Sequence, residues 1–133
     1  MDVVWVATEE DSGRYPYFPI TSSLRDLRAR VRALRTRGEG YVEVSRPEGD
    51  YPALLVGFQG EHAVVHLQAD AETMFLLHGD GSVRAEDEVD VLIFEEDSTF
   101  TGHVVMTLDH AIELLEEFAH SGSVGNHPRT CMS

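Results

Sequence analysis

Apolar residues recur at helical spacing near the end of the chain. They form one stripe along a helix of 3.6 residues per turn, and the stripe comprises Leu108, Ala111, Ile112, Leu115, Phe118 and Ala119. Thr107 suits the start of this helix because its hydroxyl can accept from a free N–H of the first turn. Gly122 suits its end because glycine readily adopts a left-handed conformation. We therefore predict an amphipathic helix that lies across one sheet face as part of the core.

A second stripe at the same spacing predicts a helix over residues 24–37. Its apolar positions are Leu24, Leu27, Val31 and Leu34. Ser22 or Ser23 suits its N-cap, and Gly38 suits its end. Four arginines form a parallel stripe one position further round the helix: Arg25, Arg28, Arg32 and Arg35. Arg32, Arg35 and Arg37 suit the negative C-terminal end of the helix, and we expect them to neutralise carboxylates of the neighbouring sheet; phosphate binding is the alternative.

Short β-favouring runs separated by polar, turn-rich segments predict strands. They cover residues 3–6, 41–45, 53–58, 63–67, 74–77 and 89–94, with 99–105 as a further candidate after the turn EEDS. The three connections that join the runs 41–45, 53–58, 63–67 and 74–77 are short. Short connections favour antiparallel pairing of these neighbours in a meander. HGDGS at 78–82 is interpreted as a hairpin turn. The order of elements predicts an α+β fold, a mostly antiparallel sheet with two amphipathic helices packed on it.

The chain of 133 residues is expected to form one domain, ordered through Pro128 and followed by a loose tail at 129–133. With 42% hydrophobic residues it can build a core. The loop at 9–19 carries Tyr15, Tyr17 and Phe18, which we expect to cover the edge of that core; contact with a ligand or partner is the alternative. The first residues do not resemble a signal peptide, no apolar run is long enough to span a membrane, and a single cysteine excludes an internal disulfide. These features favour the cytoplasm.

The charge is strongly negative and unevenly distributed. The net charge is −14, and the chain contains no lysine. Residues 1–37 carry seven arginines and five acids, whereas residues 38–133 carry three arginines and 19 acids. Such a field repels nucleic acid and anionic membranes and attracts basic partners.

A search for chemistry gives few candidates. His62 and His66 have the spacing of zinc ligands on a helix, but along the predicted strand they lie about 13 Å apart. Cys131 lies beyond the last predicted helix, where we expect no catalytic nucleophile, and HGDGS lacks the pattern of a phosphate-binding loop. The paired carboxylates fall in predicted loops or on an outer helix face. We expect no catalytic residue, no metal site and no cofactor, and hence no enzyme.

Three segments carry a resemblance to a known family: PALLVGFQGEHAVVHL, VDVLIFEED and the ending MTLDHAIELLEEFAHSGSVGNHP. From Tyr51 onward the chain resembles the bacterial immunity proteins of family one, the protective partners of polymorphic toxins. In that family an alanine-led amphipathic helix ends in phenylalanine, a glycine turn and a proline, which Ala111, Phe118, Gly122 and Pro128 match. The resemblance implies a cytoplasmic protein without catalytic activity that binds and blocks a cognate toxin. Toxins of this kind are often directed at nucleic acid, deaminases among them.

These observations lead to one hypothesis and two alternatives. An acidic surface would occupy the basic substrate cleft of a toxin, with no direct contact to nucleic acid or membrane. The residues expected to form it are Asp80, Glu86, Asp87, Glu88, Asp90, Glu95, Glu96 and Asp97. Phe100, Tyr51 or Tyr17 would supply an aromatic anchor. The alternatives are an acidic adaptor or nucleic-acid mimic that binds another basic partner, and a small enzyme or ligand-binding domain that uses the loop aromatics with His66, His78 or His103.

Overall fold

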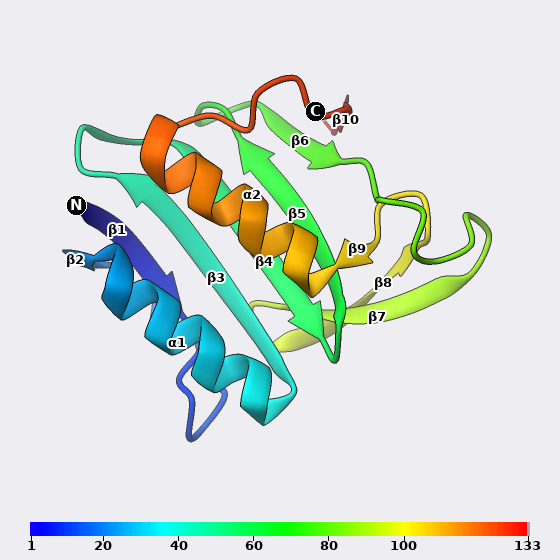
Figure 1. Ribbon diagram of the computed structural model, residues 1–133, viewed down its shortest axis with the longest axis horizontal. Helices are drawn as coiled ribbons and strands as arrows, with labels where there is room; N and C mark the ends of the chain where they lie inside the picture. Colours follow the sequence, from blue (N-terminus) through cyan, green and yellow to red (C-terminus); the bar gives the residue numbers. More distant parts are fainter. Residues whose placement is uncertain (133) are drawn as a thin grey trace.

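The computed structural model describes residues 1–132, which form two helices and ten strands (Figure 1). In chain order the elements are β1 (Asp2–Ala7), β2 (Ile20–Ser23), α1 (Leu24–Arg37), β3 (Glu39–Arg46), β4 (Gly49–Gln59), β5 (His62–Gln68), β6 (Met74–Leu77), β7 (Glu88–Ile93), β8 (Glu96–Thr101), β9 (Met106–Thr107), α2 (Leu108–Ser121) and β10 (Arg129–Cys131).

The main sheet has the strand order β10–β6–β5–β4–β3–β1–β2, and the short β9 pairs with β5. All of these pairings are antiparallel. The strands from β3 to β6 form a meander joined by short connections, as the sequence predicts. The predicted α+β class is therefore confirmed.

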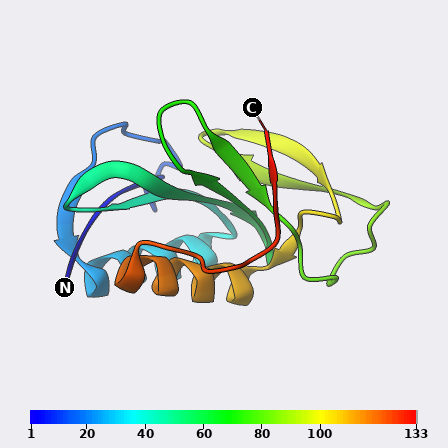
Figure 2. The same ribbon diagram turned by 90° about the horizontal axis from the view of Figure 1, so that it is seen from above.

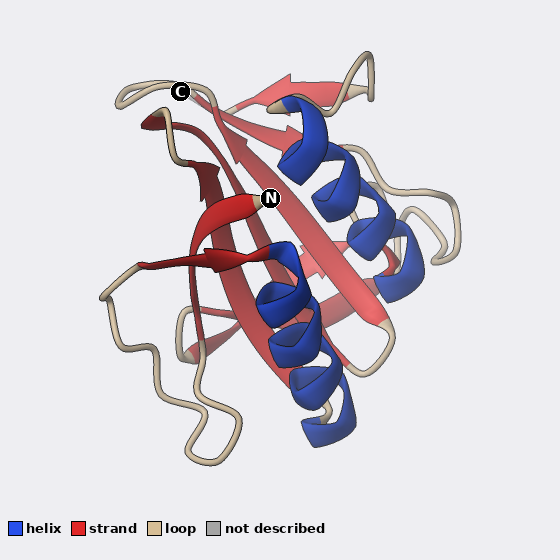
Figure 3. Ribbon diagram, turned by 60° about the vertical axis from the view of Figure 1, so that its left-hand side comes forward, coloured by secondary structure: helices blue, strands red, loops and turns tan. Residues whose placement is uncertain are grey.

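Both helices pack on one face of this sheet and run in opposite directions (Figures 1 and 3). Ser23 caps α1 by accepting from the N–H of Asp26 at 3.2 Å, and Thr107 caps α2 by accepting from the N–H of His110 at 3.2 Å. The predicted end residues, Gly38 and Gly122, are both left-handed. The predicted stripe of α1 is buried throughout. On α2, Leu114 is buried, whereas the predicted Ile112 is only half-buried, because the contact face turns slightly toward Leu114.

The opposite face of the sheet is partly covered by the β7–β8 hairpin, so the molecule has three layers (Figure 2). Val91 and Leu92 of β7 are buried between the hairpin and the sheet. The middle of β4, residues 53–58, is buried throughout because it has the helices on one side and the hairpin on the other. Sequence patterns predict the β7 and β8 strands but not that they leave the meander.

Several local expectations are wrong. The segment after Pro128 is not loose: β10 pairs with β6, with Arg129 opposite Leu77, and so satisfies backbone groups at a sheet edge. Ser133 lies outside the described residues. HGDGS is not a hairpin turn, because β6 pairs with β5 and β10 while residues 78–87 lead to the other layer. Gly79 donates to the carbonyl of His103 at 2.7 Å, which fixes this connection.

The hairpin turn also lies earlier than predicted. Phe94 and Glu95 form the turn, and the predicted turn residues Glu96–Ser98 belong to β8, which ends at Thr101. The segment before α1 forms β2, which pairs with β1 and was not predicted. Within residues 1–132, neither helix has the length and apolar character needed to cross a membrane.

Candidate functional site

The β7–β8 hairpin and the residues that lead into it carry most of the predicted acidic surface. We call the segment 84–97 the acidic hairpin; it contains seven carboxylates and one arginine. Glu88, Asp90 and Asp97 are exposed, and strand alternation places them on one face of the hairpin. Glu95 lies in the turn, and Glu96 is exposed beside it. The structure therefore brings the carboxylates of 86–88 and 95–97 onto one projecting element.

The close approach of this hairpin to the sheet depends on a glycine. A Cβ added to Gly57 of β4 would lie 2.1 Å from the carbonyl oxygen of Leu92, far inside contact distance. Glycine is therefore needed here because the β7 backbone crosses directly over β4. This crossing buries Val91 and Leu92 and leaves the charged side chains on the solvent side.

Few of the hairpin carboxylates have partners. Glu86 forms an ion pair with Arg84 at 2.6 Å, and the hydrogen bonds from Arg84 lower the pKa of Glu86. Asp90 accepts from the hydroxyl of Thr99 at 2.6 Å. In the described part of the chain, no other ion pair involves residues 86–97. The surface is therefore available to positive charge from outside.

Asp80 has a different role from the one expected. One carboxylate oxygen accepts from the backbone N–H of Thr107 at 2.9 Å, and the other accepts from that of Ser82 at 3.0 Å. Burial raises the pKa of Asp80, but the hydrogen bonds from Ser82 and Thr107 outweigh this effect and lower the pKa to about 2. Asp80 holds the start of α2 in place and is not part of the acidic hairpin.

Phe100 does not project as an anchor. It is half-buried opposite Val89, in the apolar cluster between hairpin and sheet, and its ring lies 6.0 Å from that of His66. The other two anchor candidates, Tyr17 and Tyr51, are 62% and 45% exposed. The exposed aromatic candidates therefore lie near the turn end of the hairpin and not on β8.

At that end lies a groove of about 390 Å³, which we call the aromatic groove. Its lining includes the side chains of Tyr15, Tyr17, Glu43, Asp50, Tyr51 and Phe94. Its floor is the part of the sheet that the hairpin leaves uncovered, where Val4, Ser45, Ala53 and Gln68 follow one another across four strands. Because Phe94 belongs to the hairpin turn, the groove adjoins the acidic hairpin directly.

Four rings cluster at one side of the groove, and three of them, Tyr15, Tyr17 and Phe94, line it. Tyr15 contacts Tyr17, Tyr41 and Phe94 edge-on, with ring centroids 4.6, 5.4 and 5.3 Å away. Tyr17 stacks on Phe94 at 6.0 Å with an interplanar angle of 16°. The loop at 9–19 therefore closes the edge of the core through the buried Tyr15, as expected. Tyr17 and Phe18 remain exposed, so only part of the loop acts as a cover.

The two stacked residues have unusual backbones. Tyr17 has φ 62° and Phe94 has φ 58°, and they are the non-glycine residues with positive φ in residues 1–132. This conformation costs a bulky L-residue about 1–2 kcal/mol. The contacts of the two rings with each other and with Tyr15 help to offset this cost.

Glu43 provides a carboxylate within the groove. It is half-buried on β3, and its Oε2 accepts from the hydroxyl of Tyr41 at 3.0 Å. Burial, and then the charge of Glu43, raise the pKa of both Tyr15 and Tyr41, so both phenols stay protonated and able to donate.

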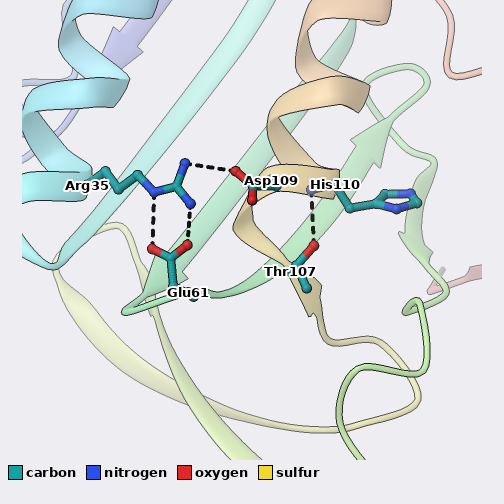
Figure 4. Close-up of polar contacts among 5 residues, drawn as sticks. All are labelled: Arg35, Glu61, Thr107, Asp109 and His110. Atoms are coloured by element: carbon teal, nitrogen blue, oxygen red, sulfur yellow. Dashed lines mark hydrogen bonds and ion pairs between the residues drawn. The ribbon is translucent and has the colours of Figure 1, made fainter.

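The arginines of α1 lie on the other side of the molecule and have internal partners. Arg35 forms a two-point contact with Glu61 and bonds Asp109 at 2.9 Å (Figure 4). These bonds, first to Glu61 and then to Asp109, raise the pKa of Arg35 further. Arg28 pairs with Glu116 of α2. The expected pairing with the sheet is found for Arg35, whose partner Glu61 directly precedes β5, whereas Asp109 and Glu116 belong to α2.

The histidines do not gather in the groove, whose lining includes none of His66, His78 and His103. His66 packs against Phe100, and burial lowers its pKa. His78 forms a hydrogen bond with the hydroxyl of Thr130 at 2.8 Å. Within residues 1–132, no three His, Cys, Asp or Glu side chains are grouped so that they could hold a metal ion.

Sequence reasoning missed Glu43, Asp50 and Phe94. The alternation of Tyr41, Glu43 and Ser45 against Val42 and Val44 is a usable signal, because it places a polar row on the sheet face away from the helices. No comparable signal marks Phe94, which lacks the glycine or asparagine typical of a tight turn.

Neither a scan of the sequence against protein-family models nor a search of curated proteins found a match.

Proposed function

We propose that this chain is an immunity protein that binds a basic bacterial toxin in the cytoplasm and blocks its substrate cleft. The observation that carries the proposal is the acidic hairpin, a projecting element with seven carboxylates of which only Glu86 has an internal ion pair within residues 1–132. A toxin that acts on nucleic acid, such as a deaminase, requires a basic groove, and a projecting acidic strand pair has the charge and shape to occupy it. The resemblance to immunity family one supports the same function.

The position of the aromatic groove supports this proposal as well. Protein interfaces draw most of their binding energy from a few aromatic or arginine anchors next to a charged rim. Tyr17, Phe18, Tyr51 and Phe94 are 62%, 79%, 45% and 38% exposed, and three of them line the groove beside the hairpin turn. In this proposal the chain acts by obstructing the substrate cleft of the toxin and carries out no reaction of its own.

The test is co-expression with a toxin candidate from a neighbouring gene, scoring growth rescue and co-purification. One variant reverses charge on the hairpin through Glu86→Lys, Glu88→Lys and Glu95→Lys. The control reverses three exposed carboxylates elsewhere through Glu72→Lys, Glu113→Lys and Glu117→Lys, so the net charge changes equally. We expect the hairpin variant to weaken binding about 100-fold or more and the control to change it much less.

Three outcomes are informative. Equal effects of the two variants would show that only overall charge matters and would remove the hairpin from the interface. Binding without rescue of growth would favour an acidic adaptor for another basic partner. Turnover of a small molecule by the purified chain would contradict the proposal.

A further inference from the structure

A carboxylate in the aromatic groove occupies an unusually apolar position. Glu43 lies in the middle of β3, and its cross-strand neighbours are Val6 and Leu55, both buried. Tyr41 donates to one oxygen of Glu43, and the phenol of Tyr15 also interacts with this carboxylate. No arginine or histidine within residues 1–132 forms an ion pair with it. Removing a carboxylate from water without a counter-charge is unfavourable. The site therefore favours the arrival of a cation.

The walls of the groove favour the same kind of ligand. Tyr17 and Phe94 present stacked rings at its mouth, and Tyr51 lies exposed among its lining residues. Cations are attracted to the faces of aromatic rings. Both residues hold these rings in place with a positive φ. Asp50 adds a second carboxylate to the lining.

We propose that the aromatic groove receives an arginine side chain from the partner protein, whose guanidinium bonds Glu43 and stacks on Tyr17 or Phe94. A planar guanidinium has five donors and can bond a carboxylate and lie flat on a ring at once, which an ammonium group does less well. A groove of about 390 Å³ also leaves room for the loop that carries the side chain. This inference rests on the proposed function for its basic protein partner, but it names the contact that anchors that partner.

A short probe tests the groove without any toxin. The capped tripeptide acetyl-Gly-Arg-Gly-amide is titrated into the ¹⁵N-labelled full chain, and amide shifts are followed by NMR. Its lysine and citrulline counterparts serve as matched ligands, since citrulline keeps the shape of arginine without the charge. We expect saturable shifts at Tyr17, Glu43 and Phe94 with the arginine probe, several-fold weaker binding of the lysine probe, and no saturation with citrulline.

Two variants assign the contacts. Glu43→Gln keeps an acceptor for Tyr41 and removes the charge, and we expect it to weaken the arginine probe about tenfold. Phe94→Leu keeps apolar bulk in the turn and removes the ring, and we expect a loss of about fivefold. The control Glu113→Gln removes an exposed carboxylate from α2 and leaves the affinity unchanged. Unchanged melting temperatures confirm that each variant is folded.

The results separate this inference from the proposed function. Equal binding of arginine and citrulline probes, equal binding of arginine and lysine probes, or no effect of Glu43→Gln would overturn the arginine assignment even if the chain rescues growth. Saturable, Glu43-dependent binding of the arginine probe would support it even if co-expression gives no rescue and the proposed function fails.

Discussion

The charged side chains on the two faces of the main sheet differ in how many form ion pairs within the fold. On the helix face, Arg35 joins α1 to Glu61 and Asp109 (Figure 4). Arg28 joins α1 to Glu116 of α2. On the other face, the acidic hairpin contains one ion pair, between Arg84 and Glu86. The helix face uses charge to connect its own elements, whereas the hairpin face leaves it unpaired.

This difference shows why the net charge alone is a poor guide to a binding surface. The helices carry many charged residues, yet Arg28 and Arg35 of α1 form ion pairs within the fold. The hairpin is smaller, but its carboxylates project from a separate layer and adjoin exposed aromatic rings. A partner of opposite charge would therefore meet the hairpin face with little competition from internal pairs.

The largest expected effect comes from separating the two layers. In Gly57→Val, the new side chain meets the backbone of Leu92, so the hairpin must move away from β4. We expect a loss of about 3 kcal/mol of unfolding free energy. Hydrogen exchange should become faster in β7 and β8, while α1 and α2 keep more of their protection. Urea unfolding and amide exchange measure the two effects.

The matched control is Gly49→Ala, because a Cβ at Gly49 has the carbonyl of Tyr51 as its nearest neighbour at 3.8 Å. It should change stability by less than about 0.5 kcal/mol. If Gly57→Val leaves hairpin exchange as slow as in the parent chain, β7 does not cross β4 as closely as described.

A smaller effect concerns Asp80, which belongs with the helix although it was expected on the acidic surface. Its folded pKa of about 2 lies below the ordinary value of 3.8. The ionised carboxylate therefore stabilises the fold above about pH 4, and this stabilisation is lost as the pH falls from about 4 to 2. Asp80→Asn should cost about 1 kcal/mol near pH 7, less than full linkage predicts because water reaches the carboxylate.

Unfolding by urea at several pH values measures this loss. The difference between Asp80→Asn and the parent chain should shrink steadily as the pH falls toward about 2. Glu113→Gln removes the same charge without removing a hydrogen bond and should change stability much less. A pH-independent difference for Asp80→Asn would show that its carboxylate charge is not what holds Thr107.

Much of the fold follows from local patterns in the sequence. The stripe Leu24, Leu27, Val31 and Leu34 and the caps Ser23 and Thr107 specify the helices, because spacing and capping are properties of neighbouring residues. The pairing of β10 with β6 and the departure of β7 and β8 from the meander depend on contacts between residues far apart in sequence. Gly57 is an example. Only the position of Leu92 in the folded structure shows that a Cβ at residue 57 would clash.

The candidate site was predictable only in part. Runs of acids at 86–88 and 95–97 mark the hairpin because charge is visible in composition. Asp80 belongs to the same acidic region, yet its oxygens bind Ser82 and Thr107. The aromatic groove assembles Tyr15, Glu43 and Phe94 from a loop, a strand and a turn, and no local pattern joins these three positions.

The smallest expected effect is a change in unfolding free energy when charge is removed, and its sign should differ between the two faces. Arg35→Gln removes the contacts with Glu61 and Asp109, which are exposed pairs, and should destabilise the chain by about 0.5 kcal/mol. Neutralising Glu95, Glu96 and Asp97 to their amides should instead stabilise it by a similar amount, because it relieves repulsion within the acidic hairpin. Both effects should fade at about 1 M NaCl, where the screening length falls to about 3 Å. If both variants change the unfolding free energy in the same direction at low salt, the hairpin carboxylates have internal partners after all, and the contrast between the faces fails.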